Sequence, residues 1–280
     1  MTREELAEIC ATAEAAIRDV YVEYEWDREP CYTATDITGQ VVAIPIGPRK
    51  LTWATARPFT DRFLFVESTE WTDDAGRRYH VAETRSYNGE MGKRLEVTRD
   101  SIEGKLSMRG ILTRSRRFIL PGSTTPQHFT LLRFLEERPD YPLSKALRNT
   151  EWVDLTCDIE HLGAFRTIRT DFYAEGIRDK QGDRVRLSRI YFSVDHGCAP
   201  VQFELFNLRK MVTRDVVAEL AEAAPGIWYP RKARSTTYNE DGAEHTFIYR
   251  ASKIVVNQDL SEDFFDIDFP PGTQIADETV

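Results

Sequence analysis

The C-terminal stretch, residues 226–280, constrains the fold more than any other part of the chain. Two runs of strand-like composition, 231–238 and 244–256, flank the turn Asn239-Glu240-Asp241-Gly242. Two such runs about a turn that contains Asp-Gly predict a long antiparallel hairpin. An aromatic-rich tail follows, and Pro270-Pro271-Gly272 stops any strand or helix there. We therefore expect an antiparallel sheet with an apolar tail packed back onto it, and no reaction chemistry in this stretch.

The first part of the chain predicts one helix followed by a meander of strands. Thr2 can cap a helix over residues 2–19, because Glu5 stands at capping-box spacing from it. Strand patterns follow at 20–26, 51–57, 62–71, 79–87, 94–98 and 102–106. The turn at 73–76 and the pair Asn88-Gly89 are hairpin signals between neighbouring strands. Such a meander is typical of an antiparallel sandwich or barrel.

The middle of the chain interrupts the strand pattern with helices. Thr125-Pro126 opens a helix over 126–137, and 143–148 predicts a second, shorter helix. These helices would cover one face or mouth of the sheet, either as a lid over a cavity or as elements that plug the core. Further strands are predicted at 152–159, 164–174, 185–194 and 200–208, and one more amphipathic helix at 212–224.

The four cysteines, Cys10, Cys31, Cys157 and Cys198, are scattered and form no C-x-x-C pair. Four cysteines allow three disulfide pairings, and their spacing does not choose among them. A chain of 280 residues does not need disulfides to fold, so we expect free, partly buried thiols. The alternative is a Cys157–Cys198 bridge, which requires their strands to be neighbours.

The sequence contains none of the familiar catalytic spacings: no P-loop, no G-x-G-x-x-G after a strand, no G-x-S-x-G and no H-E-x-x-H. Cysteine, carboxylate and histidine gather at 157–161 and at 195–198, and could form a zinc-type cluster if their strands pair. Both groups fall at predicted turns, where Asp, His and Gly occur for backbone reasons. We therefore expect no metal, no cofactor and no catalytic residue, and we predict that the protein is not an enzyme.

The C-terminal motif resembles the ending of a known family of envelope proteins. It reads Gly-Ile-Trp-Tyr-Pro at 226–230, Val-Asn at 256–257, Leu-Ser-Glu-Asp-Phe-Phe at 260–265 and Phe-Pro-Pro-Gly-Thr at 269–273. It is similar to the LolA/LolB outer-membrane lipoprotein-sorting protein family and to the RseB/MucB N-terminal-like half-barrel. The resemblance implies a mainly β (α+β) fold, a curved, unclosed antiparallel β half-barrel with an N-terminal helix and helices covering the concave face. The motif itself is structural and implies no catalytic residue.

The same resemblance, with the absence of a linker-like segment, predicts a single LolA/RseB-like domain over residues 1–280. Within it, a helical lid insertion is expected at about 125–149, and a C-terminal hairpin and tail at 226–280. We predict a non-enzymatic cell-envelope binding protein that holds a lipid, an acyl chain or a lipidated peptide in an apolar half-barrel. The alternative is an envelope sensor or protein-interaction module on the same fold, without a stable ligand.

Apolar side chains of the predicted strands and lid are the candidates for a ligand-binding surface. Most aromatic residues of this kind fill a core, but a concave sheet has more apolar face than a few short helices cover, and the remainder becomes a pocket. The candidates are Trp53, Phe63, Phe65, Phe129, Leu132, Leu135, Trp152, Phe172, Phe192 and Phe203.

Charge and hydropathy narrow the class of partner and the compartment. The net charge of −9 argues against nucleic acid, which needs a basic surface. No stretch approaches the ~18–20 apolar residues of a transmembrane helix. Met1-Thr2-Arg3 leads straight into an amphipathic helix rather than a signal peptide. We therefore expect the periplasm or cell envelope if a signal peptide has been removed, and the cytoplasm otherwise.

Overall fold

The computed structural model describes residues 1–28, 33–35, 41–43, 49–56, 62–72, 78–100, 104–115, 142–151, 153–207, 210–238 and 244–279. The chain divides into two compact units. The first unit consists of Met1–Ile17 and Pro126–Tyr249, and the second of Arg18–Thr125 and Arg250–Val280. The assignment of residues 1–280 to one domain stays a prediction.

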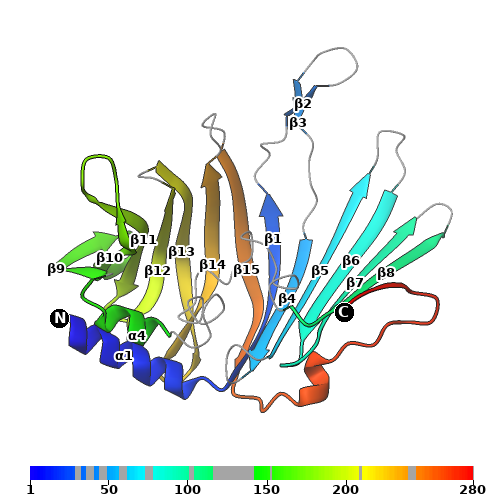
Figure 1. The fold of residues 1–280 in the computed structure, drawn as a ribbon, viewed down its shortest axis with the longest axis horizontal. Coiled ribbons are helices and arrows are strands. Elements are labelled where there is room, and N and C mark those ends of the chain that lie inside the picture. Colours follow the sequence, from blue (N-terminus) through cyan, green and yellow to red (C-terminus); the bar gives the residue numbers. More distant parts are fainter. Residues whose placement is uncertain are drawn as a thin grey trace. The chain divides into compact units, whose positions relative to one another are not determined.

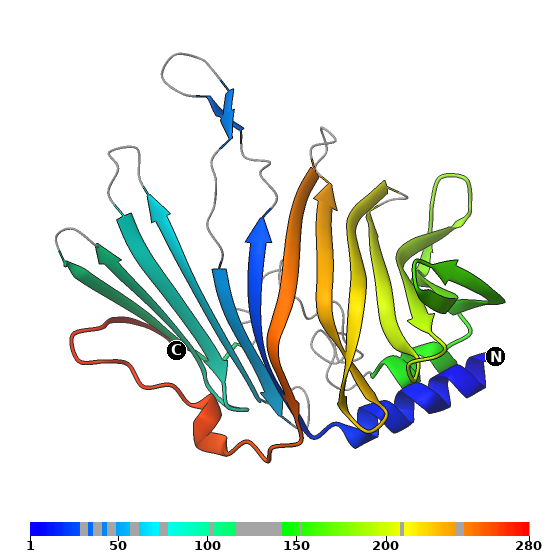
Figure 2. The same cartoon turned by 180° about the vertical axis from the view of Figure 1, so that it is seen from behind.

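The first unit is a curved antiparallel sheet with two helices on one face (Figures 1 and 2). Its strands lie in the order β9-β10-β11-β12-β13-β14-β15, and β9 is an edge strand among the described strands. Their bounds are β9 Val153–Leu162, β10 Phe165–Arg178, β11 Arg184–Ser193, β12 Ala199–Asn207, β13 Lys210–Ala224, β14 Ile227–Tyr238 and β15 Glu244–Val256, of which residues 244–249 belong to this unit. The helices are α1 (Arg3–Ala16) and α4 (Leu143–Arg148). We call the face that carries these helices the inner face, and the opposite face the outer face.

Apolar side chains that alternate along the strands form the core between the inner face and the helices. Leu6 and Cys10 of α1 and Leu147 of α4 are buried against Ile168 and Phe192 of the sheet. Burial of this apolar surface, at roughly 25 cal/mol per Å², holds both helices on the sheet. The prediction of helices over one face is confirmed for α1 and α4, whereas the helix predicted at 126–137 lies outside the described residues.

Hydrogen bonds define the beginning of α1 and join α1 to α4. Thr2 Oγ1 accepts from the backbone N of Glu5 (3.1 Å), and Thr2 N donates to the Glu5 carboxylate (2.6 Å), so the predicted capping box is present. The buried carboxylate of Glu14 accepts from the backbone N and from Oγ of Ser144, at 3.1 and 2.5 Å. Burial raises the pKa of Glu14, and the hydrogen bonds from Ser144 lower it in part.

The prediction of a helix over 212–224 is wrong, because these residues belong to strand β13. β13 pairs with β12 on one side and with β14 on the other. Its register against β14 shifts between Val217 and Glu219 and again between Glu222 and Ala224. Such bulges change the phase of the side-chain alternation, so apolar residues fall at three- and four-residue steps that imitate a helix. Strand pairing on both sides therefore decides the conformation of a segment whose spacing is ambiguous.

The second unit is also an antiparallel sheet, in the order β15-β1-β4-β5-β6-β7-β8, with β16 added in parallel to β8. The bounds are β1 Asp19–Arg28, β4 Arg49–Ala56, β5 Arg62–Thr72, β6 Arg78–Tyr87, β7 Gly92–Asp100, β8 Leu106–Thr113 and β16 Gln274–Glu278, and β2 (Thr33–Thr35) pairs with β3 (Val41–Ala43) separately. The predicted turn after β6 is confirmed, because Asn88 N donates to Met91 O (3.2 Å) and Gly89 has φ 106°.

The strand predicted at 102–106 begins only at Leu106, where β8 starts. Gly104 and Lys105 belong to the turn after β7 instead. Asp100 N donates to Lys105 O (2.9 Å), and Gly104 takes the left-handed φ of 65° that this turn needs. Residues 101–103 lie outside the described residues.

The C-terminal tail packs onto the second unit, as predicted. Phe265, in the short 3₁₀ helix Glu262–Phe265, is fully buried in an apolar cluster with Ala54 of β4. The ring of Phe269 lies against Gly110 of β8, where an added Cβ would come within 2.8 Å of the ring. Beyond the Pro-Pro-Gly segment the chain continues as β16, a strand that the sequence analysis did not predict.

The Val-Asn-Gln-Asp-Leu part of the motif is a loop held by Asp19. The carboxylate of Asp19, which is 2% exposed, accepts from the backbone N of Gln258 (2.7 Å), Asp259 (2.8 Å) and Leu260 (3.4 Å). The backbone N of Asn257 donates to Asp19 O at 3.0 Å. Asn257 and Asp259 have φ of 59° and 53°, which Asn and Asp adopt more readily than other residues with a Cβ. This part of the motif therefore has a structural role.

The predicted fold class is confirmed: the chain is mainly β, with curved, unclosed, antiparallel sheets and an N-terminal helix. The pair β8–β16 is parallel, and the pairs within the meander of each unit are antiparallel. Among the residues that the structure describes, no helix combines the length and the apolar character needed to cross a membrane.

Candidate ligand-binding pocket

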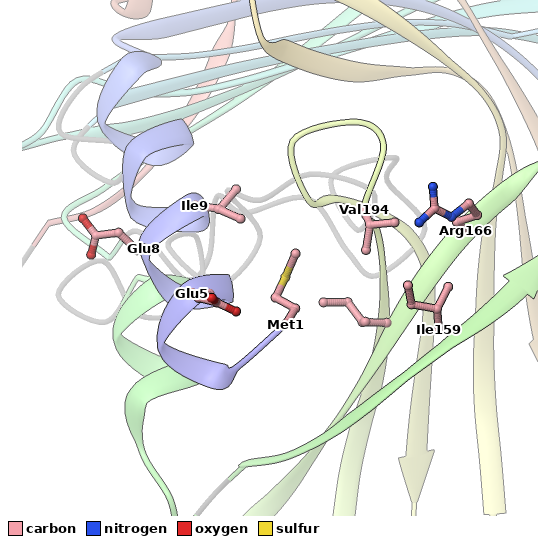
Figure 3. A pocket seen from close by; sticks show the side chains of 8 residues that line it. Met1, Glu5, Glu8, Ile9, Ile159, Arg166 and Val194 are labelled. Carbon is pink, nitrogen blue, oxygen red and sulfur yellow. The ribbon is translucent and has the colours of Figure 1, made fainter.

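A pocket of about 660 Å³ lies between the N-terminal part of α1 and the inner face of the sheet in the first unit (Figure 3). Five of its eight lining residues are apolar and three are charged. The lining consists of Met1, Glu5, Glu8 and Ile9 from the N-terminal segment, of Ile159, Arg166 and Ile168 from the sheet, and of Val194 from the turn after β11. Ligand pockets commonly measure ~300–1,000 Å³ and have mainly apolar walls with a few polar groups. The pocket thus has the size and wall chemistry of a site for an apolar ligand.

Strand alternation and helix spacing bring these side chains together. Arg166 and Ile168 are two residues apart on β10, so both side chains point to the inner face. Ile159 lies on the neighbouring edge strand β9. Val194 follows β11, and its backbone N donates to the carbonyl O of Arg166 at 2.9 Å. On α1, the lining residues recur at three- and four-residue steps, which places them on one side of the helix.

Each charged side chain of the pocket is already engaged within the chain. Arg166 Nη1 lies 3.1 Å from Asp195 Oδ1, and Glu8 Oε2 lies 2.9 Å from Arg148 Nη2. Glu5 is held in the capping box at the beginning of α1. A ligand charge that entered the pocket would lose its hydration and would have to compete with these pairs for a partner. The pocket therefore favours an uncharged ligand segment.

The structure separates the predicted ligand-binding residues into three groups. Phe172, Phe192 and Phe203 are buried in the core between the inner face and the helices. Phe63 and Phe65 are buried on β5 of the second unit. The side chain of Trp53, and the residues Phe129, Leu132, Leu135 and Trp152, lie outside the described part of the chain. None of the described members lines the pocket of Figure 3, and the assignment of these residues to a ligand stays a prediction.

The residues that line the pocket are not among the ligand-binding residues predicted from the sequence. Ile159, Ile168 and Val194 belong to alternating strand patterns like many others in the chain. Only their position beside the N-terminal part of α1 distinguishes them, and that position follows from tertiary packing. Ile159 also stands on an edge strand with half of its surface exposed, and neither feature can be read from the sequence.

The two groups of Cys, His and carboxylate weighed as a metal site lie on different elements, and the side chains of Cys157 and Asp158 lie outside the described part of the chain. Residues 157–161 lie on β9, residues 195–198 lie between β11 and β12, and β10 and β11 separate β9 from β12. Cys198 is a free thiol, so the alternative bridge Cys157–Cys198 is wrong. Within the described residues, no three His, Cys, Asp or Glu side chains are grouped so as to hold a metal ion.

His196 packs against a buried serine and two aromatic rings. Its Nδ1 lies 2.8 Å from Oγ of Ser193, whose side chain is buried. Its ring makes edge-to-face contacts with Phe165 and Trp228, at centroid distances of 5.5 and 4.6 Å. These contacts position the turn between β11 and β12, which also supplies Val194 to the pocket.

Cys10 and Cys198 are free, as predicted, and both are fully buried in the core of the first unit where partial burial was expected. Burial raises the pKa of the Cys198 thiol to about 11. Burial also raises the pKa of Cys10, and the neighbouring Cys198 and Glu14 add to the effect. Both thiols are therefore protonated at neutral pH, and a protonated, buried thiol is a poor nucleophile.

No family model matches this chain, and no curated protein matches it. Several solved structures follow it over almost its whole length. A putative outer membrane lipoprotein-sorting protein domain from Vibrio parahaemolyticus is 10% identical with a TM-score of 0.48, over 95% of this chain and 97% of that chain. A LolA superfamily protein from Nitrosomonas europaea is 9% identical with a TM-score of 0.44, over 95% and 98% of the two chains.

A DUF1329 family protein from Desulfovibrio piger is 12% identical with a TM-score of 0.43, over 94% of this chain and 95% of that chain. At these identities the likeness concerns the fold alone, and it transfers no ligand or partner to this chain. These structures, with TM-scores of 0.43 to 0.48, are what the fold of this chain is similar to.

Proposed function

We propose that the protein is a non-enzymatic binding protein of the cell envelope that holds an uncharged, apolar segment in the pocket of the first unit. The segment would be an acyl chain, of a lipid or of a lipidated peptide. The observation that carries the proposal is the apolar wall: Ile159 of β9 and Val194 after β11 line the pocket together with Met1 and Ile9, above the buried Ile168. The resemblance of the C-terminal motif supports the cell envelope as the location.

The exposure of Ile159 explains why a ligand would be bound. Its side chain lines the pocket and is nevertheless 50% exposed. A chain of methylene groups laid against this wall would remove apolar surface from water, at about 0.8 kcal/mol for each buried CH₂. Since the charged groups of the pocket already have partners, the free energy of binding would come from apolar contact.

The lining favours binding over catalysis. It contains no serine, cysteine or histidine, and its carboxylates, Glu5 and Glu8, are engaged with the capping box and with Arg148. A general base must be within hydrogen-bond reach of the proton that it removes, and a nucleophile needs an activating partner. Neither is present among the residues that line the pocket.

The test is a titration of the full chain with a fluorescent fatty acid, with a matched pair of variants. Ile159 and Ile177 are both exposed isoleucines, at 50% and 57%, on the neighbouring strands β9 and β10, but only Ile159 is part of the lining. A carboxylate against an acyl chain is costly to desolvate, so Ile159→Asp should weaken probe binding by about tenfold or more. Ile177→Asp should leave it within about twofold, and both variants should melt close to the wild type, because exposed substitutions change stability by only ~0.5 kcal/mol.

Native mass spectrometry of the purified protein supplies the second measurement, because a bound lipid should add its mass to the wild type. Absence of probe binding by the wild type, or equal weakening by Ile159→Asp and Ile177→Asp, would overturn the proposal. Absence of binding would instead favour a sensor or interaction module without a stable ligand.

A further inference from the structure

The outer face of the first unit carries a network of arginine and acidic side chains that the pocket does not use. Asp171 on β10 stands opposite Arg189 on β11, Arg189 opposite Glu204 on β12, and Glu204 opposite Arg214 on β13. These four residues form a row of alternating charge across four adjacent strands. The network contains five arginines, which we call the arginine face: Arg169, Arg184, Arg186, Arg189 and Arg214.

The two central carboxylates lie beneath the arginines. Asp171 contacts Arg189 Nε at 2.6 Å and Nη2 at 3.2 Å, and Arg186 Nη1 at 3.6 Å. Glu204 accepts from Gln202 Nε2 at 2.8 Å and lies 3.8 Å from Arg214 Nε. Both acidic side chains are 11% exposed, whereas that of Arg214 is 44% exposed. Over this central row, solvent therefore meets guanidinium N–H donors more than carboxylate acceptors, whereas at the β9 edge of the network the carboxylates of Asp154 and Glu160 are 53% and 35% exposed.

Aromatic rings and second contacts hold the arginines in place. The guanidinium of Arg184 lies 3.9 Å from the ring centroid of Tyr173, and that of Arg186 lies 4.2 Å from the ring centroid of Phe206. Arg184 Nη1 also lies 3.1 Å from each carboxylate oxygen of Asp154. A planar guanidinium that is already stacked and paired loses little conformational entropy when a further acceptor binds it. The arginine face is thus preorganised for acceptor groups.

From this arrangement we propose that the arginine face docks an acidic segment of a partner protein. Each guanidinium has five N–H donors, and carboxylates accept from them in two parallel hydrogen bonds. Arginine, tyrosine and phenylalanine are also the residue types enriched where protein interfaces are buried. The helices α1 and α4 lie on the inner face, and no other described helix packs on this sheet. This proposal uses a surface separate from the pocket and does not depend on the ligand.

The charge balance favours an acidic protein over an anionic membrane. The five arginines are offset by four carboxylates, those of Asp154, Glu160, Asp171 and Glu204, which leaves a net charge of +1 in a chain of net charge −9. Attraction to an anionic membrane depends on the net positive charge of the protein surface and only weakly on how the individual side chains are arranged. Hydrogen bonds to the carboxylates of a protein depend on fixed donors at short range, and the arginine face supplies these.

The test measures binding of a fluorescently labelled decaglutamate peptide to the full chain by anisotropy at low and at physiological salt. The double variant Arg186→Gln, Arg214→Gln removes one half-buried and one exposed guanidinium, at 30% and 44% exposure, and leaves the Arg189–Asp171 pair intact. The control is Arg148→Gln, Arg231→Gln, which makes the same charge change at exposed positions outside the arginine face. We expect salt-sensitive binding that the first variant weakens by about fivefold or more and the control changes by less than about twofold.

Three results would overturn the proposal. The first is absence of peptide binding by the wild type at low salt. The second is equal weakening by the two double variants, which would show a dependence on net charge alone. The third is binding to phosphatidylglycerol vesicles that is lost in the Arg186→Gln, Arg214→Gln variant without any binding of the peptide, which would assign the face to a membrane. Thermal melting of both variants shows whether each is folded.

Discussion

Asp19 fastens the C-terminal tail to the second unit, and its replacement should release the tail. Its buried carboxylate accepts from the backbone N of Gln258 and Asp259 at 2.7 and 2.8 Å, and more weakly from Leu260 at 3.4 Å. A hydrogen bond to a charged group contributes about 1.5–3 kcal/mol. Because Gln258 and Asp259 are exposed, water can accept hydrogen bonds from their backbone N–H groups once the carboxylate of Asp19 is removed. Two such bonds sum to about 3–6 kcal/mol, so for Asp19→Ala we expect a loss of about 3 kcal/mol of unfolding free energy, at the lower end of this sum.

Asp19→Asn separates the charge from the shape of this side chain. Its amide oxygen can still accept one hydrogen bond, but its NH₂ group would face a second N–H donor, so we expect about half of the loss, ~1–2 kcal/mol. The assays are urea unfolding followed by tryptophan fluorescence, and hydrogen exchange of the amides at 257–260. Asp268→Asn, at an exposed position of the same tail, is the matched control. Equal stability of the Asp19 and Asp268 variants, with unchanged exchange at 257–260, would refute the argument.

Three further predictions concern contacts elsewhere in the fold. Glu14→Gln should gain stability relative to the wild type as pH rises from about 4 to about 7, because burial raises the pKa of the folded carboxyl and so penalises folding at pH values above the unfolded pKa of ~4.3. Urea unfolding of both proteins at several pH values checks this prediction, with Ser144→Ala as the variant that removes the hydrogen bond to Glu14. A stability difference that does not change with pH would contradict it. Gly110→Ala should push the ring of Phe269 off β8 and cost about 1–3 kcal/mol, visible as faster proteolysis of the tail; unchanged cleavage would show that the ring moves freely. Thr2→Ala should remove the capping box and lower the unfolding free energy by about 1 kcal/mol in thermal melts followed by circular dichroism, and an unchanged midpoint would show that α1 is held by its packed face alone.

The hairpins were predictable because turn chemistry and alternation are local. Asn88-Gly89 and the run at 62–71 correspond to the turn after β6 and to β5 within a residue or two. β13 was not predictable in this way, since its bulges opposite β14 break the alternation into helix-like steps. The conformation of β13 depends on β12 and β14, which lie on either side of it in the sheet but only one of which precedes it in the chain. β16 was not predicted because it follows Pro270-Pro271-Gly272, a segment that normally ends strand pairing, and pairs with β8 beyond that segment.

The candidate site was less predictable than the fold. Aromatic residues were selected because they carry the largest apolar surfaces, and for that reason Phe172, Phe192 and Phe203 are in the core. The pocket is lined instead by aliphatic residues such as Ile159 and Val194, whose selection requires knowing where the N-terminal part of α1 lies on the sheet. A sequence pattern assigns a residue to a face, and tertiary packing decides whether the space beyond that face is filled.

The two proposed surfaces of the first unit are alternate residues of one strand. On β10, Ile168 faces the pocket, and Arg169, the next residue, faces outward to Glu160 at 3.1 Å. A shift of this strand by one residue would place a guanidinium at the fully buried position of Ile168 and an isoleucine in the charged network, and each would cost several kcal/mol. The register of β10 between β9 and β11 is therefore enforced from both faces at once. It follows that substitutions on one face, made without changing the backbone, should leave the other face intact, so that fatty-acid binding and peptide binding can be removed one at a time.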